Sequence, residues 1–274
     1  MNIELPDVNK IISEIIEVKA KSDETTQTIE KWVKDHRDDI KKNTELIKNR
    51  YDSNDLKILI IFLDSLLVRA MSGERGSKVK NELILSIKSK KDLNYKNYVQ
   101  ILNNADYRWG AEKGAPVIDG VVTYFRDELK WDWVIYFKNA EKNYRDNFQD
   151  DKLLKIKNVG YKLRDLALSN FNENYVANDL HVVRIMTRLG LLNYGFELLE
   201  DDKLEMGNNP SNENNYLFLH KLILRISELT GEKYSPSDLD RIFWHFGRTI
   251  CKAKRMCKDC PVNALCLTSK HTHR

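Results

Sequence analysis

Along most of the chain, apolar residues recur at the spacing that places them on one face of an α-helix. The isoleucines and the valine of segment 8–16 form one stripe on an otherwise charged stretch. Segment 56–71 is apolar almost all round, so we expect a central core helix there. No segment alternates between apolar and polar residues with a period of two, and we therefore expect no β-sheet. Further helices are predicted at about 29–40, 77–87, 95–103, 117–129, 133–143, 161–169, 180–189, 216–229 and 237–251, with a shorter one at 150–156.

Turn-forming residues separate these predicted helices. The polar run Asp52–Asp55 is expected to cap the helix over 56–71, and the glycine-containing segment 72–77 is expected to end it. Segment 206–215 is rich in asparagine and predicts a loop.

The composition is that of a folded protein. Of the 274 residues 42% are hydrophobic, and there are only 11 Gly and 5 Pro, which excludes a disordered or collagen-like chain. The longest apolar run, residues 58–63, is far shorter than the roughly 20 residues that span a bilayer. The first ten residues contain no basic and then apolar leader. We therefore expect a soluble intracellular protein with no membrane partner.

Basic residues gather near the C-terminal end. Lysines and arginines number 45 against 41 acidic residues, a net charge of only +4. Segment 241–274, however, holds eight lysines and arginines against the single acid Asp259. Such a block suits a polyanion such as nucleic acid. On charge alone, a solvated tail is the simpler interpretation.

The four cysteines all lie in segment 251–266, in the pattern C-x5-C-x2-C-x5-C. Disulfides are unusual in an intracellular chain and would be expected to join distant segments. Zinc sites commonly use two C-x2-C pairs, and only one such pair is present. A compact ring of thiolates suits an iron–sulfur cluster better. The spacing therefore favours a cluster, with a zinc site and free thiols as alternatives, for Cys251, Cys257, Cys260 and Cys266.

A glycine-containing turn, Lys157–Gly160, is predicted to join the short helix 150–156 to the helix 161–169. Such a hairpin exposes backbone amides at the positive end of a helix dipole, where phosphate binds favourably. Lys162 is the second residue of the second helix. The dipole and partial desolvation would favour its uncharged amine, the form that attacks carbon. The simpler interpretation is a solvated lysine.

Asp179 is predicted to cap the helix over 180–189, which Gly190 ends. A capping role alone would account for this aspartate. The intervening segment 170–178 is long enough to return the chain, so both helix starts could open on the same side. An amine and a carboxylate would then face one cleft. We interpret His181 as a hydrogen-bonding residue rather than a catalytic one.

Aromatic residues in the middle of the chain could stack on bases. Their helical spacing favours a place in the core instead. The residues concerned are Trp109, Trp131, Trp133, Tyr136 and Tyr144.

Three of these segments, taken in order, resemble the endonuclease III superfamily of DNA glycosylases. Ile156–Lys162 is similar to that family's hairpin, Leu-Pro-Gly-Val-Gly-x-Lys, and Asn178–Arg184 to its segment Val-Asp-Thr-His-Val-x-Arg. Gly247–Cys251 and the following cysteines are similar to its C-terminal iron–sulfur loop. The resemblance covers Asp150–Cys266, nearly half of the chain.

The chain departs from the family's pattern in two places. Lys157 and Asn158 stand where the hairpin of the family has Pro-Gly, so an asparagine must make the turn, and asparagine tolerates left-handed backbone. The first gap between cysteines is five residues here and six in the family. The residue that fills the space left by an extruded base is not assigned, although segment 69–73 aligns loosely with that region.

The resemblance implies an all-α, two-lobed helix-hairpin-helix DNA glycosylase fold with a C-terminal iron–sulfur loop. Residues 1–54 would form N-terminal helices that pack on the C-terminal lobe. Residues 55–190 would form a helical barrel lobe with the hairpin, and residues 191–274 the C-terminal lobe with the cluster loop.

The resemblance also implies an activity in base excision repair. The protein would be a bifunctional DNA N-glycosylase and AP lyase that acts on double-stranded DNA containing a modified or damaged base. Lys162 would form a Schiff base at C1′ of the sugar, and Asp179 would assist. The expected DNA contacts are Asn158, Val159, Gly160, Tyr161, Lys252, Lys254, Arg255 and Lys258, and the expected ligands of a 4Fe-4S cluster are Cys251, Cys257, Cys260 and Cys266.

Other functions stay open at this point. The alternatives are a non-catalytic or monofunctional glycosylase-like DNA-binding protein and a helical DNA-binding protein stabilised by zinc. We expect a monomer, in the cytoplasm with the nucleoid or in the nucleus of a eukaryote. The sequence does not predict which base is excised.

Overall fold

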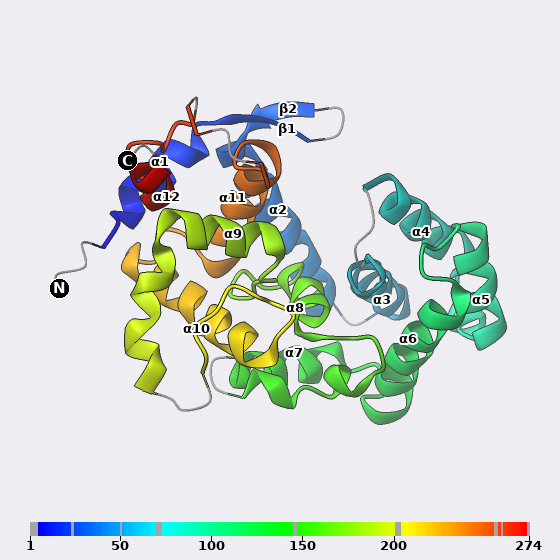
Figure 1. Cartoon of the computed structure of the whole chain (residues 1–274). Coiled ribbons are helices and arrows are strands. Elements are labelled where there is room, and N and C mark those ends of the chain that lie inside the picture. The colour runs from blue at the N-terminus through cyan, green and yellow to red at the C-terminus, as the bar shows by residue number, and fades with distance from the viewer. Residues whose placement is uncertain are drawn as a thin grey trace. The chain divides into compact units, whose positions relative to one another are not determined.

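The computed structural model describes residues 5–22, 25–49, 51–68, 73–144, 147–200, 204–254, 257–258 and 260–272. Within these ranges the chain is helical except for loops and one small two-stranded sheet (Figure 1). The all-α class predicted from the sequence is therefore confirmed. No helix in the described part of the chain is long and apolar enough to cross a membrane.

The chain divides into two compact units. Residues 39–175 form one of them, here called the central unit, and residues 1–38 join 176–274 in the other, here called the terminal unit. The three-segment division drawn from the sequence, at 54/55 and 190/191, has different boundaries and stays a prediction.

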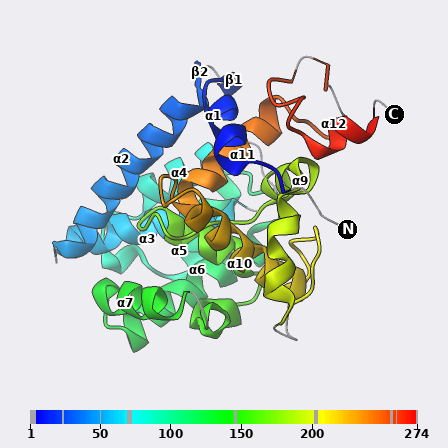
Figure 2. The same cartoon turned by 90° about the vertical axis from the view of Figure 1, so that its left-hand side faces the viewer.

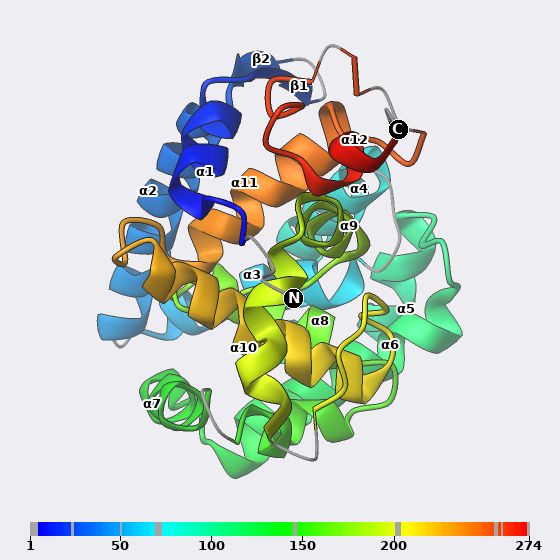
Figure 3. The same cartoon turned by 60° about the vertical axis from the view of Figure 1, so that its left-hand side comes forward.

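The terminal unit is built around helix α11 (Pro236–Thr249), which begins with a Ser235 capping box and a proline in its first turn. It packs against α9 (Leu180–Leu189), α10 (Glu213–Leu229) and α1 (Val8–Ile16). Figure 2 and Figure 3 show α1 beside α11. The apolar stripe predicted for segment 8–16 is confirmed, because Val8, Ile11, Ile12 and Ile15 are buried in this core. The unit also contains the 3-10 helix η5 (Leu191–Glu200) and α12 (Leu267–Thr272).

A short β-hairpin follows α1 in the terminal unit. Strand β1 (Lys19–Ser22) pairs antiparallel with β2 (Thr25–Thr28), with Lys19 opposite Thr28. The prediction that the chain has no sheet is therefore wrong. Each strand has only four residues, too few to show an alternating pattern, and threonine supplies the β-propensity of β2. The hairpin leads into α2 (Ile29–Lys48), which begins in the terminal unit and ends in the central unit.

Helix α3 (Asp52–Leu67) is the core helix of the central unit, as the sequence predicts. It packs against α4 (Gly73–Ser86), α6 (Ala111–Thr123) and α8 (Tyr161–Ser169). Phe62 of α3 is fully buried in a cluster of aromatic rings. The remaining helices are η1 (Lys90–Asp92), α5 (Tyr95–Asn104), η2 (Tyr124–Glu128), α7 (Trp133–Asn143), η3 (Phe148–Asp150) and η4 (Lys152–Lys155).

The core interpretation of the central aromatic residues is confirmed for Trp133, Tyr136 and Tyr144, which are at most 4% exposed. Trp109 and Trp131 are half-buried instead. Both residues lie between helices, Trp109 before α6 and Trp131 before α7, so the helical spacing of apolar residues does not decide whether they are buried.

Several predicted helix ends are wrong. Helix α3 begins at Asp52, so the residues expected to precede and cap it form its first turn instead. The positive end of the helix dipole stabilises the acidic side chains there. Residues 73–77 were expected to break a helix, yet they begin α4. An ion pair between Lys78 and Glu74 and the packing of α4 on α3 and α5 outweigh the low propensity of its glycines.

The helix predicted over 117–129 changes character before it ends. After Thr123 the chain forms η2, a single stretch of π-helix, and then Lys130 and Trp131 both adopt left-handed backbone with φ of 50° and 60°. The helix predicted over 150–156 is replaced by two 3-10 turns, because η3 ends at Asp150 and η4 covers only Lys152–Lys155.

A buried guanidinium ties α8 to the segment that precedes it. Arg164 is 1% exposed, and its Nη1 donates to the carbonyl of Phe148 at 2.6 Å and to Asp151 Oδ2 at 3.2 Å. Its Nε donates to the carboxylate of Asp165, which is fully buried. The hydroxyl of Tyr136 donates to the same Asp151 oxygen at 2.9 Å. One cation therefore joins α7, η3, η4 and α8.

Substituting Arg164→Ala should destabilise the central unit by about 3–5 kcal/mol, because it leaves two buried carboxylates without their cation. The measurement is urea unfolding followed by tryptophan fluorescence. Arg126→Ala is the matched control: its guanidinium pairs with Asp127 on the surface, and it should cost about 1 kcal/mol or less. Equal losses in the two variants would contradict the role given to Arg164.

Candidate functional site

The hairpin of the central unit forms as the sequence predicts. Asn158 adopts left-handed backbone with a φ of 72°, so asparagine makes the turn that glycine makes more commonly. Val159, 6% exposed, anchors the turn in the core, and its amide donates to the carbonyl of Ile156 at 3.0 Å. The turn is therefore fixed from inside, with Asn158 and Gly160 on the surface.

Gly160 is the N-cap of α8 and has no side chain with which to cap it. Its φ of −107° is open to any residue, and a Cβ at this position would meet nothing within 4 Å. The fold itself therefore does not need glycine here. Because Gly160 has no side chain, a ligand can come close to the first backbone amides of α8. This is the positive end of the helix dipole, which attracts anions.

Lys162 is exposed on the first turn of α8. Its neighbours hold this turn in place: Leu163 is buried, and the half-buried ring of Tyr161 lies against Phe148 with centroids 5.5 Å apart. The backbone amides of Leu163 and Arg164 both donate to the carbonyl of Gly160 at 3.1 Å. The first turn of α8 is therefore held in place, with the Lys162 side chain on its surface.

Asp179 is the N-cap of α9, in the terminal unit, as predicted. Its Oδ1 accepts hydrogen bonds from the amides of His181 at 2.6 Å and Val182 at 3.2 Å. Helix α9 ends at Gly190 with a φ of 84°, the predicted left-handed cap. The carboxylate is half-buried and held by the helix start.

Helix α9 is fastened to α11 and to the first cysteine by Arg184. Its Nη2 lies 2.9 Å from His181 Nδ1 and donates to the carbonyl of Gly247 at 2.6 Å, and its Nε donates to the carbonyl of Cys251 at 3.1 Å. The interpretation of His181 as a hydrogen-bonding residue is confirmed. A Cβ on Gly247 would lie 3.0 Å from the carbonyl oxygen of His181, so glycine permits this close packing.

The four cysteines line one small apolar cavity in the terminal unit, with a volume of about 20 Å³. Arg188 Nη1 donates to Cys251 Sγ at 3.2 Å, and the thiol of Cys266 donates to the carbonyl of Arg188 at 3.2 Å. Burial raises the pKa of Cys260 to about 11 and also raises that of Cys266. Backbone amides oppose both shifts by donating to the sulfurs: Val262 to Cys260, and Thr268 and Ser269 to Cys266.

Among the described residues, no three His, Cys, Asp or Glu side chains meet closely enough to hold a single metal ion. The basic side chains Lys252, Lys254 and Lys258 of the cysteine loop are exposed. Arg255, predicted to contact DNA, lies outside the described residues, and so do residues 69–72 of the segment considered for the base-wedging role.

The loop that contains Trp109, for which the sequence favoured a place in the core, lies beside the hairpin. Tyr107, Trp109 and Lys113 line a cavity of about 170 Å³ together with Asn158 and Leu163. The side-chain Nδ2 of Asn158 lies 3.5 Å from the carbonyl oxygen of Lys113. Left-handed backbone at Asp106 and Gly110 brackets this loop. In the sequence, the turn-forming residues Asp106 and Gly110 on either side of Tyr107 and Trp109 could have indicated this loop.

The fold is similar to that of solved structures of endonuclease III bound to DNA. One is a trapped covalent intermediate, the estranged-adenine complex, with a TM-score of 0.51 and 19% identity over 88% of this chain and 99% of that chain. The other is a non-covalent complex, with a TM-score of 0.50 and 20% identity over 88% of this chain and 98% of that chain. No family model and no curated protein sequence matches. The chain thus has an endonuclease III-like fold, which confirms the predicted helical glycosylase fold, while the iron–sulfur loop stays a prediction.

Asn158→Gly should leave stability unchanged or raise it by up to about 1 kcal/mol, because glycine adopts left-handed backbone without cost. Asn158→Val should lower stability by about 1–2 kcal/mol, because a β-branched residue is strained there. Urea unfolding of the two variants provides the comparison. Equal stabilities would show that the turn does not require this backbone conformation.

Proposed function

We propose that this protein is a bifunctional DNA glycosylase and AP lyase that removes a modified or damaged base from double-stranded DNA. The observation that carries the proposal is an exposed lysine two residues after an open glycine cap, on the fold of an enzyme that was trapped covalently on DNA. A non-catalytic protein would need the fold and the basic surface but not this lysine.

Lys162 is the proposed nucleophile. Its amine would attack C1′ of the sugar as the base departs with the electrons of the glycosidic bond, and loss of the ring-oxygen bond and of a proton would leave a Schiff base. β-Elimination would then cut the strand on the 3′ side. The packing of Leu163 and Tyr161 supports this role, because it fixes the first turn of α8, from which Lys162 projects.

Asp179 is proposed to assist as a carboxylate. Two backbone amides bind its Oδ1 and hold the carboxylate at the start of α9. An ionised group can accept a proton from the nucleophile and stabilise positive charge on the sugar.

The proposed grip on DNA uses the hairpin and the cysteine loop. Amides from Val159 to Lys162 would bind a backbone phosphate, with Asn158, Gly160 and Tyr161 around it. The exposed Lys252, Lys254 and Lys258, with Arg255, would neutralise further phosphates. The cavity formed by Trp109, Lys113 and Asn158 lies beside the hairpin and offers an aromatic side chain to an unstacked base.

We further propose that the four cysteines hold a 4Fe-4S cluster. Four thiols around one apolar cavity, with backbone amides and Arg188 donating to their sulfurs, is the donor set that such clusters use. Cys251, Cys257, Cys260 and Cys266 would be the ligands. When bound, the cluster would supply rigidity to the basic loop rather than chemistry on the sugar.

Borohydride trapping tests the nucleophile. The native chain should form a covalent complex with duplexes that carry a modified base or an abasic site, because borohydride reduces the Schiff base to a stable amine. Lys162→Ala should form none. Lys155→Ala, an exposed lysine of the same unit, is the matched control and should trap normally. Trapping that survives Lys162→Ala would contradict the assignment, and binding without trapping would favour a monofunctional enzyme or a non-catalytic binder.

Asp179→Asn tests the carboxylate without removing the cap, because asparagine caps helices as well as aspartate does. Base release should slow by about a hundredfold or more, while the thermal midpoint of unfolding stays close to that of the native chain. Single-turnover kinetics on the duplex that traps fastest measures the rate. An unchanged rate would leave Asp179 with the capping role alone.

Metal and sulfide analysis tests the cluster. The purified native protein should be brown and contain iron and acid-labile sulfide, and Cys257→Ala should lose both. Thr268→Ala removes a side chain from the same cavity without removing a thiol and is the control. Zinc in place of iron would instead support the zinc-stabilised alternative.

A further inference from the structure

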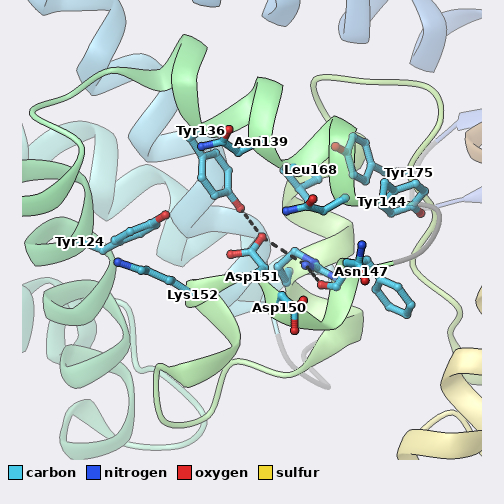
Figure 4. A pocket seen from close by; sticks show the side chains of 14 residues that line it. Tyr124, Tyr136, Asn139, Tyr144, Asn147, Asp150, Asp151, Lys152, Leu168 and Tyr175 are labelled. Carbon is cyan, nitrogen blue, oxygen red and sulfur yellow. Dashed lines mark hydrogen bonds and ion pairs between the residues drawn. The ribbon is translucent and has the colours of Figure 1, made fainter. Parts of the chain in front are cut away.

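A second pocket of the central unit lies on the other side of α8 from Lys162. Its volume is about 210 Å³, and its walls come from α7, η2, the η3–η4 segment, α8 and Tyr175 (Figure 4). Arg164 and Leu168 line it from α8. At 3.6 residues per turn, these two positions face roughly away from Lys162. The pocket is therefore separate from the site proposed for the lyase chemistry.

Three buried tyrosines form part of the wall of this pocket. Tyr136, Tyr144 and Tyr175 are 2%, 4% and 1% exposed, and Figure 4 shows them around the same space. The buried hydroxyl of Tyr175 has no hydrogen-bond partner in the described part of the chain. Burial raises the pKa of Tyr175, so its hydroxyl stays protonated and able to donate. An unsatisfied buried hydroxyl is unfavourable, and a ligand that accepts a hydrogen bond from it would remove this penalty.

Three of the four charged side chains in the described lining of the pocket are in ion pairs, and the fourth, Asp150, is an anion that would repel a phosphate. Arg164 is paired with Asp151 and Asp165, and Lys152 with Glu128. A phosphate or another strongly charged ligand would therefore have to displace an existing ion pair. The ligand that fits best is a neutral one.

The rim of the pocket offers amides. Asn139 and Asn143 stand one turn apart on α7, and Asn147 follows on the loop. An amide both donates and accepts, so these side chains can read the edge of a ring that carries both kinds of group. Together with the tyrosine faces they favour a planar heteroaromatic ring.

The backbone next to the pocket is unusual. The π-helix η2 places Tyr124 at the pocket wall, with its ring 6.2 Å from that of Tyr136 and nearly perpendicular to it. Single π-turns are rare and occur frequently at functional sites. After Leu129, the two residues Lys130 and Trp131 adopt left-handed backbone. The unusual backbone of this segment is an observation separate from the side chains of the pocket, and it lies beside the same pocket.

We propose that this pocket binds a free nucleobase or nucleoside. Aromatic faces stack on a planar ring, the asparagine amides bind its edge, and the Tyr175 hydroxyl supplies a buried hydrogen bond. A volume of about 210 Å³ accommodates one such ring and leaves no room for a second. This site goes beyond the proposed glycosylase function and does not depend on it.

Titration of the full-length chain with thymidine, deoxycytidine, deoxyadenosine and deoxyguanosine tests the proposal. Saturation-transfer NMR detects binding, and calorimetry measures the Kd. At least one nucleoside should bind saturably, in the micromolar to millimolar range expected of so small a ligand. Methyl glucoside, a ring of similar size without an aromatic face, should not bind.

Variants then locate the site. Tyr175→Phe removes only the buried hydroxyl and should weaken binding by about fivefold to tenfold. Ala140→Trp should fill the pocket and abolish binding. Lys138→Ala, on the exposed face of α7, is the control and should change nothing. Lys162→Ala should also bind normally, so failure here and failure of the lyase proposal are distinguishable.

Three outcomes would overturn the proposal. One is the absence of binding by all four nucleosides, and another is binding of methyl glucoside alone. The third is nucleoside binding that neither Tyr175→Phe nor Ala140→Trp weakens. Should Ala140→Trp fail to fold, the comparison of Tyr175→Phe with Lys138→Ala decides the question.

Discussion

The buried guanidinium of Arg164 is the constraint on which the arrangement of the central unit depends. A cation in an apolar core is tolerable only if anions and carbonyls surround it. Arg164 satisfies this condition by collecting Asp151, Asp165 and the carbonyl of Phe148 from separate turns of the chain. The η3–η4 segment and the start of α8 therefore cannot move apart without exposing an unpaired charge. Lys162, two residues before Arg164, takes its position from this arrangement.

The terminal unit uses an arginine in the same way. Arg184 reaches from α9 to the carbonyls of Gly247 and Cys251, and the missing side chain of Gly247 allows the two helices to lie close enough. The helix that Asp179 caps is thus attached to the loop of cysteines. In both units a guanidinium serves because it has several donors in a fixed plane, which lysine cannot offer. Arg184 positions α9 through two backbone carbonyls, and Arg164 positions the start of α8 through one carbonyl and two carboxylates.

Local chemistry made parts of this structure predictable from the sequence. The cap of Asp179, the left-handed Gly190 and the left-handed Asn158 follow from the preferences of single residues. The helix Tyr161–Ser169 was predicted to the residue for the same reason. Apolar periodicity likewise identified α1, and a segment that is apolar almost all round identified the core helix α3. These features depend on a few neighbours along the chain.

Features that depend on distant contacts could not be predicted. The four-residue strands of the β-hairpin carry too little pattern, and the glycines of α4 are helical only because neighbouring helices support them. No pattern in the sequence indicates that Arg164 and Tyr136 both bind the carboxylate of Asp151. The loop of Tyr107 and Trp109 likewise comes to Asn158 through tertiary packing. The roles of Lys162 and Asp179 in chemistry stay predictions, as do the cysteine ligands.

The division of the chain has a consequence for the order in which it folds. Residues 39–175 are continuous, whereas the other unit joins 1–38 to 176–274. During synthesis the continuous unit can complete its core while the ribosome is still adding later residues. The apolar face of α1 must meanwhile wait for α11, more than two hundred residues further on. Contacts of such sequence separation form slowly. Until they form, α1 exposes a stripe of isoleucines, and that interval is when the nascent chain is most open to aggregation or to a chaperone.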